Sequence, residues 1–193
     1  KTVDTPVDNP PDDRVRPKNL LPLHPQNAWV FGAKPRFRPA SNPMWVSPRE
    51  LSFRTQTFYH LRYGIEIPGP TADLQAFPSL LRNDSTGLNF FLPVNTNDTL
   101  IITQQPKYMY TLPYPARVGT IDSNGTSDYR VRLTHVDTLI TMFATSIMLP
   151  CHRYEVWHRQ RIKTVFYIVP GICFLRIEDE EANYFTFGWR LKR

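Results

Sequence analysis

The segment that most constrains the fold is residues 128–149, because a strand pattern there runs directly into a helix pattern. Apolar and aromatic residues alternate with arginine over residues 129–133, which is the period-two pattern of a strand with one buried face. The opposite face carries the guanidinium groups of Arg130 and Arg132. Two cations side by side indicate that this face meets an anion rather than solvent alone.

A helix is expected to begin at Thr134. Asp137 stands three residues later, so the pair approximates a capping box in which Asp replaces the usual Glu. Apolar residues then recur at spacings of three and four, which places them on one stripe of a helix. Because Pro150 cannot continue a helix, the helix should end near Met148. The residues of the stripe are Val136, Leu139, Ile140, Phe143 and Ile147.

Two further strand patterns follow the expected helix. Residues 151–161 alternate, and residues 164–169 form an apolar run after a short basic connection. The order strand, helix, strand, strand predicts an α+β fold, in which a helix covers one face of a small antiparallel sheet (a β-α-β-β core). Other candidate strands are residues 88–92, 99–103, 107–112 and 172–177.

A long, Pro-rich, extended arm is expected to precede this core. Residues 1–48 hold ten of the nineteen prolines and show no periodicity. A neighbouring chain or RNA should hold such an arm, and its aromatic residues suit stacking on bases or insertion into a partner; the alternative is that they pack on their own domain. Residues 48–63 are expected to form a short helix. The aromatic residues are Trp29, Phe31, Phe37 and Trp45.

Five short motifs occur in an order that matches a known protein family. They are Phe77-Pro78 with Arg82 and residues 88–91; Tyr129-Arg130-Val131; Thr134, Val136 and Asp137; Leu149-Pro150 with Val156; and Arg161-Ile162-Lys163 with Val165, Tyr167 and Val169. Residues 76–179 therefore resemble the core of large-subunit ribosomal protein twenty-three in its mitochondrial form. The chain departs from that family because the long basic loop is short and residues 113–127 look like an insertion.

The resemblance divides the chain into an N-terminal extension (1–75), a ribosomal-protein-like core (76–180) and an aromatic-basic tail (181–193). It implies a structural constituent of the mitochondrial large ribosomal subunit, which binds ribosomal RNA near the polypeptide exit tunnel in the matrix. The arm and the tail would contact neighbouring ribosomal proteins. The nascent chain and membrane-insertion factors are further implied partners.

The charge of the chain favours a polyanionic partner, because the formal net charge is +6 and the pI is near 9.5. Seventeen of the twenty-three cations are arginine, whose planar fork binds phosphate bidentately, although a biased composition would give the same count. Contacts to phosphates would fix the domain on RNA without reading its sequence. The expected RNA-binding residues are Arg130, Arg132, Arg153, Arg159, Arg161 and Lys163, with Arg36 and Arg38 in the arm.

No residue pattern points to an enzyme, a metal site or a cofactor. Cys151, His152 and His158 lie close together, but their spacing matches no zinc pattern, and neighbouring strand residues point to opposite faces. No glycine-rich phosphate-binding spacing occurs, and two cysteines do not make a disulfide framework. No apolar run is long enough to span a membrane as a helix.

Two other classes of protein fit the composition. One is a non-catalytic accessory subunit of a mitochondrial respiratory complex or ATP synthase, which is also basic and carries Pro-rich extensions. The other is a capsid or secreted β-protein, favoured by three glycosylation sequons at Asn83, Asn97 and Asn124. The β-α-β order between Tyr108 and Ile177 is expected for the ribosomal family and accidental for the alternatives.

Overall fold

The computed structural model shows an all-β protein. Within the described part of the chain every regular element is a strand, and none is a helix. Arg36, Arg38 and the candidate strand at 99–103 lie outside the described residues. The described residues are 17–25, 27–35, 43–63, 80–92, 105–122, 128–142, 145–179 and 182–190.

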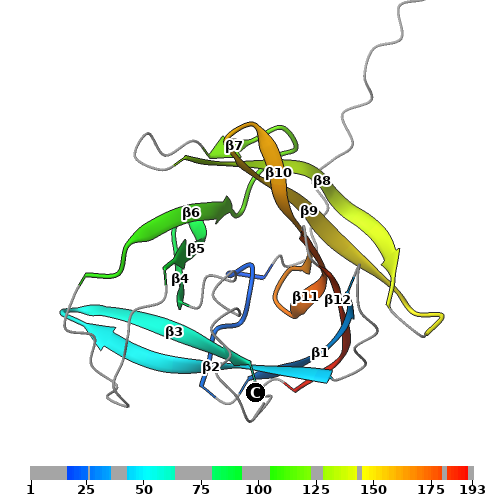
Figure 1. The fold of residues 1–193 in the computed structure, drawn as a ribbon, viewed down its shortest axis with the longest axis horizontal. Helices are drawn as coiled ribbons and strands as arrows, with labels where there is room; N and C mark the ends of the chain where they lie inside the picture. Colours follow the sequence, from blue (N-terminus) through cyan, green and yellow to red (C-terminus); the bar gives the residue numbers. More distant parts are fainter. Residues whose placement is uncertain are drawn as a thin grey trace, which may run out of the picture.

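Twelve strands form one antiparallel sheet in the order β6-β5-β4-β3-β2-β1-β12-β11-β10-β9-β8-β7 (Figure 1). The strands of the first half are β1 (Ala28–Pro35), β2 (Pro43–Phe53), β3 (Gln56–Tyr63), β4 (Leu80–Asp84), β5 (Gly87–Phe91) and β6 (Tyr108–Pro113). Those of the second half are β7 (Ile121–Asp122), β8 (Tyr129–Thr141), β9 (Met148–His158), β10 (Arg161–Val169), β11 (Cys173–Asp179) and β12 (Ala182–Arg190).

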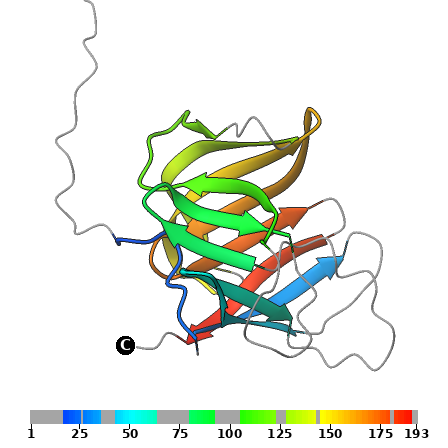
Figure 2. The ribbon, with the colours of Figure 1, turned by 90° about the vertical axis from the view of Figure 1, so that its left-hand side faces the viewer.

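Each half of the chain is a meander of hairpins, and the first strand joins the two halves. β1 pairs with the last strand, β12, over the register from Ala28↔Arg190 to Pro35↔Ala182. The sheet also curls, so that β4 to β6 face β9 to β11 across the interior (Figure 2). A ring contact between Phe90 on β5 and Phe166 on β10, with centroids 5.5 Å apart, shows that the two halves share one core.

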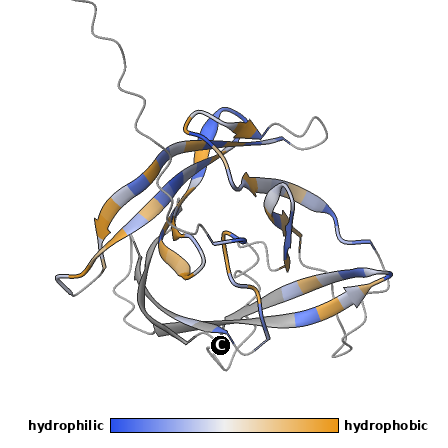
Figure 3. Cartoon of the chain, turned by 180° about the vertical axis from the view of Figure 1, so that it is seen from behind, coloured by the Kyte–Doolittle hydropathy of each residue, from blue (hydrophilic) through white to orange (hydrophobic). Residues whose placement is uncertain are grey.

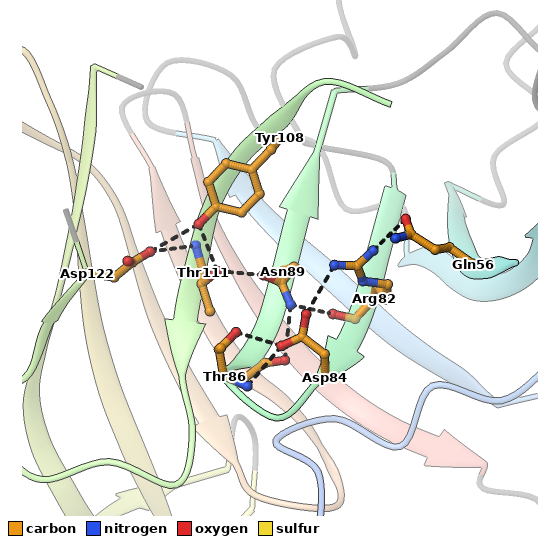
Figure 4. A network of polar contacts seen from close by, with 9 residues as sticks. Gln56, Arg82, Asp84, Thr86, Asn89, Tyr108, Thr111 and Asp122 are labelled. Carbon is orange, nitrogen blue, oxygen red and sulfur yellow. Dashed lines mark hydrogen bonds and ion pairs between the residues drawn. The ribbon is translucent and has the colours of Figure 1, made fainter. Parts of the chain in front are cut away.

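Side chains, rather than a strand pair, join the two ends of the curled sheet (Figure 4). The carboxylate of Asp122 on β7 accepts hydrogen bonds from the backbone N–H of Thr111 and from the hydroxyl of Tyr108, both on β6 and both at 3.1 Å. The Thr111 hydroxyl donates to the buried Asn89 on β5 at 2.6 Å. Beside these bonds, the rings of Tyr110 and Tyr129 pack with centroids 5.4 Å apart, which brings β6 against β8.

A segment without regular structure fills the interior. Residues 17–25 cross the space that the sheet encloses (Figure 1), and Leu20 and Leu21 are 1% and 0% exposed. Backbone carbonyls of this segment accept hydrogen bonds from strand β4 and from the residues that follow β6 and β10, so the segment is bonded to the sheet as well as packed against it. These bonds are Gly171 N–H to Leu20 O (3.0 Å), Asn83 Nδ2 to Leu21 O (2.8 Å) and Tyr114 Oη to Pro17 O (2.9 Å).

The predicted α+β fold is wrong, because the expected helix from Thr134 is the second half of β8. Burial along β8 alternates with a period of two, and the segment is rich in β-branched residues, which favour strands. Asp137, taken as part of a capping box, has φ 52° at a register shift between His135 and Thr138. It is a bulge residue, and Asp tolerates this left-handed conformation better than most.

The segment that we expected to be an extended arm contributes strands to the same sheet. β1, β2 and β3 all lie within residues 28–63, and the helix expected over 48–63 is instead the hairpin of β2 and β3. Trp29 follows the alternative interpretation and packs on its own domain: it is 0% exposed, and its indole N–H donates to the carbonyl of Ile172 at 2.8 Å. The prediction of an arm relied on the prolines, but Pro43 and Pro48 lie within strand β2.

The remaining strand predictions agree with the structure. The alternating or apolar runs at 88–92, 107–112, 129–133, 151–161, 164–169 and 172–177 correspond to β5, β6, the start of β8, β9, β10 and β11. The β8–β9 hairpin extends beyond the neighbouring strands, and hydrophobic residues gather at its end (Figure 3). Leu139, Ile147 and Met148 there are each more than half exposed.

We expect the interior segment to contribute strongly to stability. Leu21→Ala should lower the free energy of unfolding by about 2–5 kcal/mol, because it removes buried methyl groups and leaves a cavity. Urea unfolding followed by circular dichroism measures this change. Leu139→Ala is the matched control, since Leu139 is 56% exposed. An equal cost for the two substitutions would contradict the packing of residues 17–25 in the core.

Closure of the sheet by Asp122 gives a second prediction. Asp122→Ala should lower the free energy of unfolding by about 1–3 kcal/mol, because it removes the acceptor of the Thr111 N–H and one hydrogen-bond partner of the Tyr108 hydroxyl. Asp122→Asn keeps one acceptor oxygen and should cost less. In a Tyr108→Phe background the Asp122→Ala cost should shrink. Strictly additive costs would show that the bond between Tyr108 and Asp122 does not act across the junction.

Candidate nucleic-acid interface

The outer face of β8 and β9 brings several predicted residues together. Val131, Leu133 and Val156 are buried, so the residues that alternate with them point outward. Arg130 lies opposite Trp157 in the β8–β9 register, and Arg132 lies opposite Glu155. Both arginines are exposed, whereas Trp157 is half-buried, because side chains of the neighbouring strands cover part of its ring.

Two more arginines lie at the turn between β9 and β10: Arg159 is its first residue, and Arg161 begins β10. Arg159 and Gln160 have φ values of 47° and 69°, the left-handed geometry that a tight two-residue hairpin requires. The backbone N–H of Arg159 donates to the carbonyl of Asp128 at 3.4 Å, and its Nε lies 3.5 Å from the Asp128 carboxylate. The side chain of Arg159 is nevertheless 77% exposed, and Arg161 is also exposed.

Arg153 belongs to a different arrangement. The Tyr167 ring lies between two guanidinium groups, with Arg153 5.8 Å and Arg176 5.6 Å from its centroid. Burial by itself would lower the pKa of Arg153, but the Tyr167 hydroxyl and the Glu155 carboxylate raise it above its ordinary value. Arg153 also donates to the Thr134 hydroxyl at 2.8 Å. These contacts make Arg153 a half-buried structural cation rather than a phosphate ligand.

A simple spacing separates the two kinds of arginine. Three arginines have a carboxylate two positions later on the same strand and form ion pairs with it: Arg82–Asp84, Arg153–Glu155 and Arg176–Glu178. In contrast, Arg130 is followed by Arg132, and Arg159 by Arg161. Among the described residues, no ion pair involves Arg130, Arg132 or Arg161. Arg161 pairs with His158 and therefore lies on the side of the sheet opposite to Trp157, and Arg159 lies in the turn beside Asp128. We call Arg130, Arg132 and Trp157 the cationic face.

Not every predicted site residue belongs to this face. Lys163 is half-buried at a register shift between Ile162 and Thr164, and Arg36 and Arg38 lie outside the described residues. Trp157 was missing from the predicted site. The alternation along β9 already placed it on the face that carries Arg153 and Glu155, so the signal was present in the sequence.

A cavity of about 310 Å³ lies where the start of β6 meets the start of β8 and the end of β9. Its residues Tyr129 and His158 are opposite each other in the register, so they lie on the other side of the sheet from Arg130 and Trp157. His158 stacks on Tyr129 there, with ring centroids 4.7 Å apart and an interplanar angle of 27°, and its Nε2 lies 3.9 Å from the Asp128 carboxylate. Sequence analysis missed this cavity because the curl of the sheet, and not any local motif, assembles it. Its lining residues are Leu92, Lys107, Tyr108, Met109, Asp128, Tyr129 and His158.

The cysteines are not placed for nucleophilic chemistry. Cys151 and Cys173 are both 0% exposed, and burial raises the pKa of each thiol to about 12. The charge of Asp137 adds to the shift at Cys151, whose thiol donates to the Thr138 carbonyl at 3.2 Å. Within the described ranges no three potential metal ligands cluster.

Comparisons with protein-family models, with curated proteins and with solved structures found no match. The described part of the chain contains no helix long and apolar enough to cross a membrane.

We expect neither thiol to react with a maleimide in the native protein near neutral pH, because each is buried and protonated. Both should react within minutes in denaturant. Mass spectrometry of the labelled protein counts the modified cysteines. Rapid labelling of Cys151 in the native protein would contradict the burial of this β9 residue.

Proposed function

We propose that this protein binds single-stranded RNA through the cationic face. The observation that carries the proposal is that two exposed arginines, Arg130 and Arg132, share the outward face of β8 and β9 with one half-buried tryptophan, Trp157. Proteins that bind single strands combine a positively charged surface that follows the phosphates with aromatic rings on which bases stack. Arg130 and Trp157 lie opposite each other in the register, so one nucleotide can contact both.

The expected mechanism is electrostatic and largely independent of base sequence. Each arginine that neutralises a phosphate releases condensed counterions, which makes affinity fall steeply with salt concentration. A guanidinium fork can hold two phosphate oxygens at once and can also stack on a base. Trp157 supplies a stacking surface that tolerates every base.

The proposal rests on this face and not on the resemblance to the ribosomal family. That resemblance needed a helix after Thr134, and the segment is strand β8. That the bound RNA is ribosomal RNA near the exit tunnel of the mitochondrial large subunit stays a prediction. Co-sedimentation with that subunit, lost on ribonuclease treatment, tests it. Migration with a detergent-solubilised membrane complex would instead favour the accessory-subunit alternative.

A charge-removal experiment tests RNA binding directly. Arg130→Gln/Arg132→Gln should weaken binding of an oligouridylate of about ten nucleotides by roughly 10-fold near physiological salt. The slope of log affinity against log salt should fall by about 1.4, because two phosphate contacts are lost at about 0.7 each. Fluorescence anisotropy over a salt series measures both quantities.

Lys18→Gln/Arg54→Gln is the matched control, because it removes the same charge at exposed positions away from the cationic face. Its affinity and salt slope should stay close to those of the unmodified protein. Equal losses in the two double variants would mean that net charge alone drives binding. Absence of measurable binding by the unmodified protein would overturn the proposal.

A further inference from the structure

We infer that the cavity between β6, β8 and β9 is a binding site for one unstacked nucleobase, with guanine preferred. The inference deepens the proposed function, because it assigns a base-specific site to a surface that otherwise contacts phosphates. It starts from position: Asp128 lines the cavity and also contacts Arg159, which lies in the turn two residues after Trp157, at 3.5 Å. A strand that leaves Arg130 and Trp157 and bends around Arg159 at the edge of the sheet would reach the cavity, because Tyr129 and His158 lie on the opposite side of β8 and β9.

The size of the cavity suits a single base with its sugar. Sites for drug-sized ligands span about 300–1,000 Å³, and this cavity is at the small end of that range. A double helix or a stack of several bases would not enter it. Proteins that read single-stranded RNA commonly take up bases one at a time, once they are splayed out of the stack.

The lining has the chemistry that a base requires. Leu92 and Met109 supply apolar surface, and the stacked pair of Tyr129 and His158 supplies aromatic rings. Lys107 adds a cation on the same lining, where it can meet the phosphate of the bound nucleotide. Base-on-aromatic stacking contributes to affinity for every base, so these residues favour entry without choosing among bases.

Asp128 supplies the choice among bases. A carboxylate only accepts hydrogen bonds, and guanine offers two adjacent donors, the ring N1–H and the exocyclic N2 amine. A carboxylate can accept both at once, whereas uracil presents one ring N–H between two carbonyl acceptors. Asp128 thus pairs well with guanine and poorly with uracil.

The cavity is held in shape from outside, which lowers the cost of binding. Tyr129 is supported by Tyr110 behind it, with centroids 5.4 Å apart. The hydroxyl of Tyr108 is fixed by Asp122 at 3.1 Å and by Thr111 at 2.7 Å. Since these contacts join the two ends of the sheet, the cavity depends on the closure of the fold.

The test compares oligouridylates of about ten nucleotides that carry guanosine, inosine or uridine at one central position. Guanosine should raise affinity by about 10-fold over uridine, in line with a good two-bond base contact. Inosine, which lacks the N2 amine, should fall between them. Equal affinities for all three would overturn the base site while leaving RNA binding intact.

Two variants locate the effect. Leu92→Trp fills the cavity and should abolish the guanosine preference, so that the guanosine-containing strand binds no more tightly than the all-uridine strand. Leu139→Trp makes the same substitution at another exposed leucine and should keep the preference. Asp128→Asn, which replaces one hydrogen-bond acceptor by a donor, should also remove the guanosine preference. A preference that survives both Leu92→Trp and Asp128→Asn would place the recognition elsewhere.

Guanosine monophosphate separates this inference from the proposed function. It should raise the Tm of the unmodified protein by more than uridine monophosphate does, and it should not raise the Tm of Leu92→Trp. Nucleotide binding without oligonucleotide binding would sustain the cavity and overturn the RNA proposal. If neither guanosine monophosphate nor the oligonucleotide binds, both the cavity inference and the RNA proposal are overturned.

Discussion

The structure depends on how the two ends of its sheet are joined. An open sheet of twelve strands would leave the N–H groups of β6 exposed at one edge, and an exposed edge invites association with other chains. Here the Asp122 carboxylate takes the Thr111 N–H and the Tyr108 hydroxyl. One side chain thus replaces a strand pair at the junction. It also fixes β6 beside β8, and the cavity depends on that placement.

Closure also explains why the first sixty residues look like an arm when they are considered alone. β1 pairs with β12 at the far end of the chain, with Ala28 opposite Arg190. Its other partner, β2, lies nearby in the sequence, but the pairing with β12 joins the two ends of the chain, and local patterns carry no information about it. Contacts between such distant residues are costly to form first and should form late in folding. Trp29 marks the position of this strand, because its indole bonds to the Ile172 carbonyl.

Sequence patterns predicted the strands correctly where one strand face is buried by near neighbours. They predicted the wrong element where the same residues fit both a helix and a strand. The alternation over 129–133 correctly placed Arg130 and Arg132 on the outer face of β8. Beyond it, Val136 and Ile140 fit both a helical stripe and a period of two, and Asp137 resembled a capping residue although it forms a bulge. Proline content outweighed the strand pattern of β2. The cavity lies beyond local prediction, because Leu92 and His158 meet only through tertiary closure.

Charge spacing along the strands connects the sequence with the proposed function, because it determines which arginines are ion-paired. Residues two apart on a strand share a face, so an acid two positions after an arginine neutralises it in place. This chain does so at Arg82, Arg153 and Arg176, and each of these guanidinium groups also lies over an aromatic ring. At Arg130 and Arg132 the second position is another cation, and like charges on one face repel. Such repulsion lowers stability slightly in the isolated protein and disappears when a polyanion lies between the two groups. The arginines that the fold leaves unneutralised are therefore the ones to which we assign RNA.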